Sequence, residues 1–186
     1  MARINSVTRG DIPDDQLDAF DQFVKQRGNV PTAGPFSIML FAPEMLARGE
    51  RLRAYLSGEE SSLPGNIRWL AILVTARELD CQFVWHVNVA LGRESGLSNA
   101  LVDNLRDKKP LSGLSLQESA VLDYGREFFR TRRVSQRTFD TALGHFGARG
   151  LTELTTLMGY YAMLAFNINA FEVGLPEERT ETALPV

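Results

Sequence analysis

Cysteine and histidine are scarce in this sequence. Its 186 residues include one cysteine, Cys81, and two histidines, His86 and His145. A single cysteine excludes an intrachain disulfide and a zinc site built from cysteines alone. Even with both histidines, a structural zinc ion would depend on carboxylates, which is an unusual ligand set. We therefore expect no metal, no cofactor and a protein that folds in a reducing compartment.

The sequence also lacks a long apolar run and an excess of basic residues. Its most apolar stretches, 69–76 and 83–91, are much shorter than the roughly 20 residues that cross a membrane. The polar residues 1–11 do not resemble a signal peptide. Lysine and arginine number 20 against 23 aspartate and glutamate, so no surplus of positive charge exists to neutralise phosphates. We expect no membrane and no nucleic-acid partner, and a cytoplasmic location, most simply in a bacterium.

What the sequence does contain is a helical spacing of apolar residues along most of its length. Hydrophobic residues make up 44% of the chain, and strand signals are scarce. A chain of this size buries roughly two thirds of its unfolded surface in one domain. We predict an all-α protein of about seven or eight helices, with residues 1–186 forming a single domain. A polar first helix precedes the core, and a charged tail after Gly174 is expected to fray.

Capping residues, prolines and glycines mark where the helices begin and end. The expected starts lie near Pro13, Pro43, Asn66, Phe83, Ser98, Ser115, Ser135 and Leu151. Ser115 and Glu118 have the spacing of a capping box, in which each side chain satisfies a free N–H of the other residue. Gly147 and Gly150 are expected to separate the last two helices. Phe128, Phe139 and Leu143 are expected to pack inward.

The two most apolar central segments carry the polar residues that could form a site. At about 100° per residue, Cys81, Val84, Trp85 and Asn88 share one face of a helix, and His86 lies on a second face. Cys81 and Asn88 are therefore expected to face one pocket. Cys81 is alternatively a small buried apolar side chain. His86 is alternatively a hydrogen-bonded histidine at a helix or subunit interface.

Arg77 directly follows the first of these apolar segments. It is a candidate to bind a substrate carboxylate, and the alternative is a structural ion pair with a neighbouring carboxylate. Trp69, Val84 and Trp85 would supply the apolar wall of the same pocket.

The stretch from Ala76 to Ser98 resembles the carboxymuconolactone decarboxylase family, whose superfamily includes alkylhydroperoxidase D. The matching residues are Ala76-Arg77-Glu78-Leu79-Asp80-Cys81-Gln82-Phe83-Val84-Trp85, then Ala90 and Gly96-Leu97-Ser98. Similar matches lie at 42–44, 151–164 and 169–176, so the resemblance covers about residues 35–176. It implies an all-α, alkylhydroperoxidase D-like helical bundle whose subunits assemble into trimers or hexamers.

The sequence departs from this superfamily at the redox positions. In the hydroperoxidase branch, a glutamate, a Cys-x-x-Cys pair and a histidine act together, and they map to Trp69, Cys81, Val84 and Asn88. Only the first cysteine is kept, which blocks a two-cysteine peroxidase cycle within one subunit. The resemblance therefore implies a cofactor-independent lyase that decarboxylates a small lactone or carboxylated aromatic breakdown product.

In such a lyase, Arg77 or Arg68 would bind a carboxylate, Asn88 would donate to the developing oxyanion, and His86 would supply a proton. The histidine would act in its own subunit or in a neighbouring one. Two other functions stay open. The chain is alternatively a divergent, non-redox member that binds a small ligand or serves as an oligomeric scaffold. It is alternatively a thiol-dependent antioxidant in which Cys81 works with an external thiol.

Overall fold

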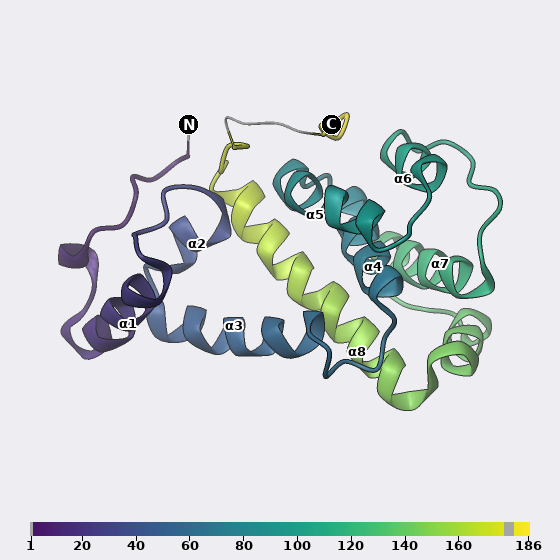
Figure 1. Ribbon diagram of the computed structural model, residues 1–186, viewed down its shortest axis with the longest axis horizontal. Coiled ribbons are helices and arrows are strands. Elements are labelled where there is room, and N and C mark those ends of the chain that lie inside the picture. Colours follow the sequence, from purple (N-terminus) through teal and green to yellow (C-terminus); the bar gives the residue numbers. More distant parts are fainter. Residues whose placement is uncertain (1, 177–180) are drawn as a thin grey trace.

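The computed structural model describes residues 2–176 and 181–186, and all the regular secondary structure in these ranges is helical (Figure 1). Two 3₁₀ turns, Arg9–Asp11 and Asp14–Gln16, precede the first α-helix. The helices are α1 Leu17–Arg27, α2 Gly34–Met39, α3 Pro43–Ser57, α4 Gly65–Glu78, α5 Gln82–Glu94, α6 Asn99–Arg106, α7 Leu116–Thr131 and α8 Gln136–Ala170. The predicted all-α class is confirmed. Within these ranges, no helix is long and apolar enough to cross a membrane.

Helix α4 forms the centre of the molecule. It packs against α5, α7 and α8, and its residues from Leu70 to Arg77 are all buried. Helix α8 crosses the molecule diagonally, with α2 and α3 on one side and α4, α5 and α7 on the other (Figure 1). A helix covered on most sides must be apolar nearly all round, which explains the sequence of α4.

Local capping explains most of the helix starts. Ser98, Ser115 and Ser135 each accept a hydrogen bond from a backbone N–H of the first helical turn. Ser115 and Glu118 form the predicted capping box, with the Ser115 N–H donating to the Glu118 carboxylate over 2.7 Å. The first helix differs from the prediction, because it begins at Leu17 after the two 3₁₀ turns.

Gly147 divides the long helix α8, as its sequence position predicts. Its φ of 66° and ψ of 176° lie outside the helical region, so the chain kinks between the two parts of α8. Gly150 does not break the helix, which corrects the prediction. A Cβ atom at Gly150 would lie 3.1 Å from the Phe146 Cβ and 3.4 Å from the Ser62 Oγ, so this glycine permits close packing.

Three apolar side chains that were expected to be buried are exposed, namely Phe128, Phe139 and Leu143. Phe139 and Leu143 belong to the part of α8 before the kink, and Ala142 is its buried residue. This part therefore contacts the core through one narrow stripe. The number of faces that a helix buries depends on its neighbours, which spacing alone does not show.

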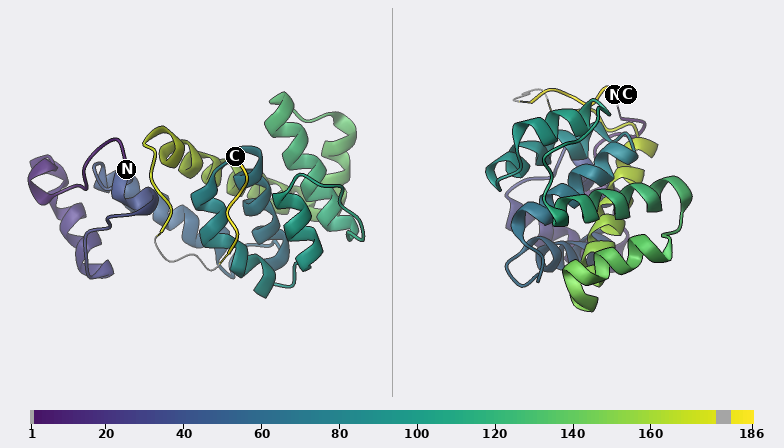
Figure 2. Two further views of the ribbon diagram at one scale, coloured as in Figure 1. Left: turned by 90° about the horizontal axis from the view of Figure 1, so that it is seen from above. Right: turned by 90° about the vertical axis from the view of Figure 1, so that its right-hand side faces the viewer.

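Residues 181–186 pack against α4 and α5, which corrects the expectation of a frayed tail for this segment. Leu184 is only 2% exposed. Its carbonyl accepts a hydrogen bond from Gln82, and the Pro185 carbonyl accepts one from Arg77. Figure 2 shows the segment, in yellow, lying along the teal helices. The rest of the expected tail includes 177–180, which lie outside the described residues.

Candidate functional site

Cys81 lies at the N-cap of α5 and is completely buried. Burial raises the pKa of its thiol, although the backbone N–H groups of Val84 and Phe83 act in the opposite direction. A thiol with these properties has little nucleophilic thiolate at neutral pH. Association with other subunits cannot increase the exposure of a side chain that is already covered in one subunit.

Val84, Trp85 and Asn88 are buried on the face of α5 that the helical spacing predicts. The Asn88 amide donates to the Val84 carbonyl over 2.6 Å, so one of its N–H groups is used within its own helix. The indole N–H of Trp85 is buried without a hydrogen-bond partner among the described residues. None of these three side chains lines either of the two cavities described below.

His86 lies on a different face of α5 from Cys81, and it is 8% exposed. Its Nδ1 atom is buried and has no partner among the described residues. A buried polar atom without a partner carries a desolvation cost, and such atoms in native proteins are often explained by a ligand or a water.

Arg77 is 1% exposed and makes structural contacts. Its Nη1 donates to the carbonyls of Arg106 and Pro185, over 3.0 and 3.2 Å, and its Nη2 pairs with Asp80. Its Nε has no partner within the described ranges. The arrangement matches the structural ion pair that the sequence left open. Trp69, on α4, is partly buried and lines neither cavity.

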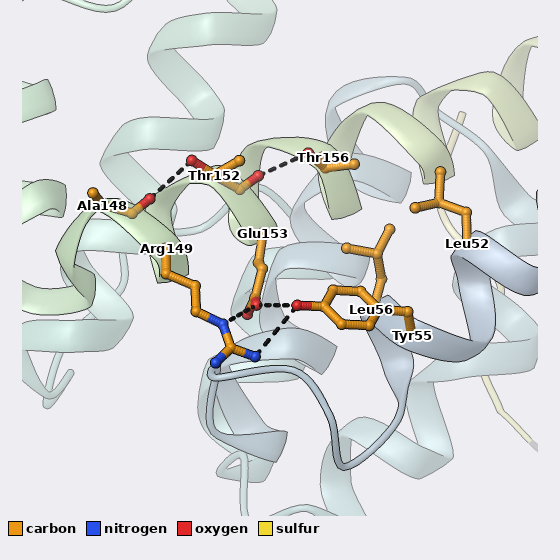
Figure 3. A pocket seen from close by; sticks show the side chains of 8 residues that line it. All are labelled: Leu52, Tyr55, Leu56, Ala148, Arg149, Thr152, Glu153 and Thr156. Atoms are coloured by element: carbon orange, nitrogen blue, oxygen red, sulfur yellow. Dashed lines mark hydrogen bonds and ion pairs between the residues drawn. The ribbon is translucent and has the colours of Figure 1, made fainter.

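The larger cavity, of about 470 Å³, is a groove between α3 and α8 that is open to solvent (Figure 3). This volume is in the range of small-molecule sites. Leu52, Tyr55 and Leu56 come from α3, and Ala148, Arg149, Thr152, Glu153 and Thr156 come from α8 after the kink at Gly147. The hydroxyls of Thr152 and Thr156 donate to backbone carbonyls one turn earlier, so they are not free to donate to a ligand.

Glu153 fixes the polar end of this cavity. It accepts hydrogen bonds from Tyr55, Ser61, Arg149 and, through both its N–H and its hydroxyl, Ser62, at 2.7–3.1 Å. Burial alone would raise the pKa of Glu153, but these hydrogen bonds outweigh it and hold the pKa at about 2. The carboxylate is therefore charged at neutral pH, and its oxygens are too fully occupied to act as a base.

Arg149 lies at the open edge of the cavity, with its side chain 66% exposed. Its Nε donates to Glu153, and its Nη2 donates to the Glu60 carbonyl and the Tyr55 oxygen. Figure 3 shows the side chains of Arg149, Glu153 and Tyr55 meeting at one point. No protein acceptor in the described ranges takes a hydrogen bond from Nη1 of Arg149. The cavity thus combines apolar walls with donors but offers no free charged acceptor, which suits a ligand with an anionic oxygen.

Tyr55, Arg149 and Glu153 were not among the site residues predicted from the sequence. A signal for Glu153 was present, because it lies between Leu151 and Leu154 in an apolar-periodic segment. A carboxylate at that position must find partners, and Arg149 lies one helical turn earlier.

The smaller cavity, of about 280 Å³, lies beside the first turn of α5. Its lining includes Asp80, Gln82, Phe83, Asn169 and Val186. The described residues hold no group of three or more histidine, cysteine, aspartate or glutamate side chains placed to bind a metal.

Solved structures with this fold define its class. An alkylhydroperoxidase AhpD core, an uncharacterized peroxidase-related protein from Ralstonia eutropha, is 14% identical, with a TM-score of 0.69 over 95% of this chain and 93% of that one. A protein of unknown function from Agrobacterium tumefaciens is 20% identical, with a TM-score of 0.67 over 75% of this chain and 96% of that one. The debrominase Bmp8, solved as a cysteine-to-alanine variant with 2,3,4-tribromopyrrole, is 11% identical, with a TM-score of 0.68 over 94% of this chain and 91% of that one.

The chain therefore has the alkylhydroperoxidase D-like helical fold. Identities of 11–20% establish the fold and not the activity. No protein-family model and no curated protein matches the sequence.

Proposed function

We propose that the protein is a non-redox member of the alkylhydroperoxidase D-like fold that binds a small carboxylate-bearing ligand between α3 and α8. The observation that carries this proposal is the preformed cavity of about 470 Å³, with apolar walls and a rigid polar end. Glu153 holds Tyr55 and Arg149 in place, and Arg149 keeps free N–H groups for an acceptor on the ligand. Small carboxylated rings and lactone acids have this combination of an apolar body and an anionic group.

Isothermal titration calorimetry with matched ligands tests the proposal. Benzoate, 4-hydroxybenzoate and a carboxymuconolactone form the acidic series, and benzamide is the uncharged control. Benzamide lacks the charge-assisted contact with Arg149 and is expected to bind more weakly than benzoate. Equal affinity for benzoate and benzamide, or no binding of any acid at millimolar concentration, would refute the proposal.

A lyase of the carboxymuconolactone decarboxylase type is the second candidate. Two buried nitrogen atoms that have no partner among the described residues favour it. They are Nε of Arg77 and Nδ1 of His86, which come from adjacent helices. Arg77 would bind the substrate carboxylate, Asn88 would donate to the oxyanion and His86 would supply the proton. Product analysis with a carboxymuconolactone tests this function. Release of carbon dioxide that is lost in both Arg77→Ala and Asn88→Ala would support it, and turnover unchanged in both variants would refute it.

A thiol-dependent antioxidant role is the least supported of the three functions. Peroxide reduction needs a thiolate in contact with the peroxide, whereas Cys81 is fully buried and has a raised pKa. The chain holds no second cysteine that could resolve an oxidised Cys81.

We also propose that the subunits associate, as a trimer or hexamer. Val87 and Leu91 are exposed on one face of α5, and Phe166 on α8 is 70% exposed. Large apolar side chains in such positions are typical of surfaces that are covered in an assembly. Light scattering combined with gel filtration tests this, with Phe166→Glu expected to lower the measured mass. A monomeric mass for the unmodified protein would refute it.

A further inference from the structure

Residues 181–186 are held against α5 and α4 by three polar contacts and one buried side chain. The Glu181 carboxylate pairs with Nε of Arg93 at 3.3 Å. The Leu184 carbonyl accepts from Nε2 of Gln82 at 2.9 Å, and the Pro185 carbonyl accepts from Nη1 of Arg77 at 3.2 Å. Every one of these contacts places an oxygen of the segment against a nitrogen of the helices.

The segment runs antiparallel to α5. Gln82, His86, Val89 and Arg93 lie within an arc of about 60° on the helix, so they form one stripe. The two ends of this stripe, Gln82 and Arg93, contact Leu184 and Glu181 and are about 16 Å apart along the axis. Three extended residues span about 10 Å, and the long side chains of Arg93 and Glu181 cover the remainder. The shortest path between the two contacts crosses the part of α5 that carries His86 and Val89.

His86 lies at the edge of the buried face of α5, beside the exposed Val87. Its Nδ1 is buried and has no partner in the part of the chain that the structure describes, and the same holds for Nε of Arg77. Both side chains are more than nine-tenths buried. The two adjacent helices that the segment contacts thus hold polar atoms that no described residue satisfies.

The segment itself is weakly anchored. Leu184 is its one buried residue, and Val186 is 73% exposed. One buried leucine must offset the loss of conformational freedom of six residues, so the segment belongs to the least stable part of the fold.

We propose that residues 181–186 form a displaceable strap that covers His86 and closes a carboxylate-binding site at Arg93. In the closed state the strap places its own oxygens, those of Glu181, Leu184 and Pro185, against Arg93, Gln82 and Arg77. In the open state Nε of Arg93 donates to the carboxylate of a ligand instead. The proposal does not depend on the cavity between α3 and α8. If the lyase function is correct, the strap controls access to its residues.

Histidine labelling with diethylpyrocarbonate, read by mass spectrometry, tests the strap. The chain has two histidines, and His145, which is partly exposed, is the internal reference. In the full chain, His86 is expected to react at least about tenfold more slowly than His145, because reaction requires the strap to open. Removing residues 181–186 should raise the His86 rate about tenfold and leave the His145 rate unchanged.

Point variants guard against a shortened chain that does not fold. Leu184→Ala removes the buried anchor and should raise the His86 rate, whereas Thr182→Ala, at an exposed strap residue, should leave it unchanged. A His145 rate equal to that of the full chain confirms that a variant is folded. A His86 rate that is as fast as that of His145 in the full chain, or that Leu184→Ala and the deletion both leave unchanged, would overturn the proposal.

A peptide added in trans tests the carboxylate preference. The acetylated peptide Glu-Thr-Ala-Leu-Pro-Val should protect His86 of the shortened chain at millimolar concentration. The peptide with glutamine in place of glutamate should protect it about tenfold less well, because the ion pair with Arg93 is lost. Failure of both peptides to protect an exposed His86, or equal protection by both, would refute the carboxylate site.

Discussion

Glu153→Gln should measurably destabilise the protein. The carboxylate is 5% exposed and accepts five hydrogen bonds, one of them from a guanidinium. Glutamine keeps the size of the side chain but loses its charge, and its amide nitrogen cannot accept from these donors. Hydrogen bonds to buried charged groups contribute roughly 1.5–3 kcal/mol each, but they are not additive.

We expect a loss of about 2–3 kcal/mol in the free energy of unfolding. This is less than the sum over the five hydrogen bonds, because the weakened bonds partly readjust. For a chain of this length, that loss lowers Tm by about 5–10 °C. Calorimetry or thermal unfolding followed by circular dichroism measures it. Asp21→Asn is the control, since it removes an exposed ion pair with Arg9 and should change Tm little.

The difference between the original protein and Glu153→Gln should depend on pH. The pKa of Glu153 is about 2 in the folded protein and 4.5 for an unperturbed glutamate. A depressed pKa contributes stability that is fully present above the unfolded pKa and is lost as pH falls towards the folded one. The Tm difference should therefore be constant near neutral pH and narrow below about pH 4.5. Equal Tm values for the original protein and Glu153→Gln at pH 7 would refute the role assigned to Glu153.

Three further experiments test other parts of the structure. Gly147→Ala places a side chain at a φ of 66° and should cost about 1–3 kcal/mol in thermal unfolding, whereas Gly144→Ala, in an open helical position, should be neutral or stabilising. Gly125→Ala puts a Cβ 2.9 Å from the Met158 Cε, and denaturant unfolding should show a loss of about 1–3 kcal/mol. Iodoacetamide should label Cys81 at least about 100-fold more slowly in the native protein than after unfolding, and fast native labelling would contradict its burial.

The parts of the fold that depend on local sequence were predictable. Ser98, Ser115 and Ser135 begin helices because a capping side chain acts on the next turn. The kink at Gly147 follows from a conformation that glycine adopts readily. The arc that carries Cys81 and Asn88 was predictable from the helical angle.

The parts that depend on distant segments were not predictable. Tyr55 and Glu153 are 98 positions apart, and the spacing of either helix does not show that they meet. The same is true of Arg77 and Pro185, which are 108 positions apart, and their contact turns an expected frayed tail into an ordered one. Gly150 was expected to end a helix, because glycine often occurs at helix ends. Glycine also occurs where helices pack closely, as Gly150 does, and the sequence does not distinguish the two uses.

The most direct test of the central claim is fluorine NMR of 4-fluorobenzoate with two matched variants. Thr156 lines the cavity and Thr141 lies on the same helix outside it, and both hydroxyls donate to the carbonyl one turn earlier. Thr156→Trp fills the cavity, whereas Thr141→Trp adds the same side chain elsewhere. We predict saturable broadening of the fluorine signal with the original protein and Thr141→Trp, and none with Thr156→Trp. Broadening that Thr156→Trp leaves unchanged, or that is absent with the original protein, would contradict the proposal that this cavity is the ligand site.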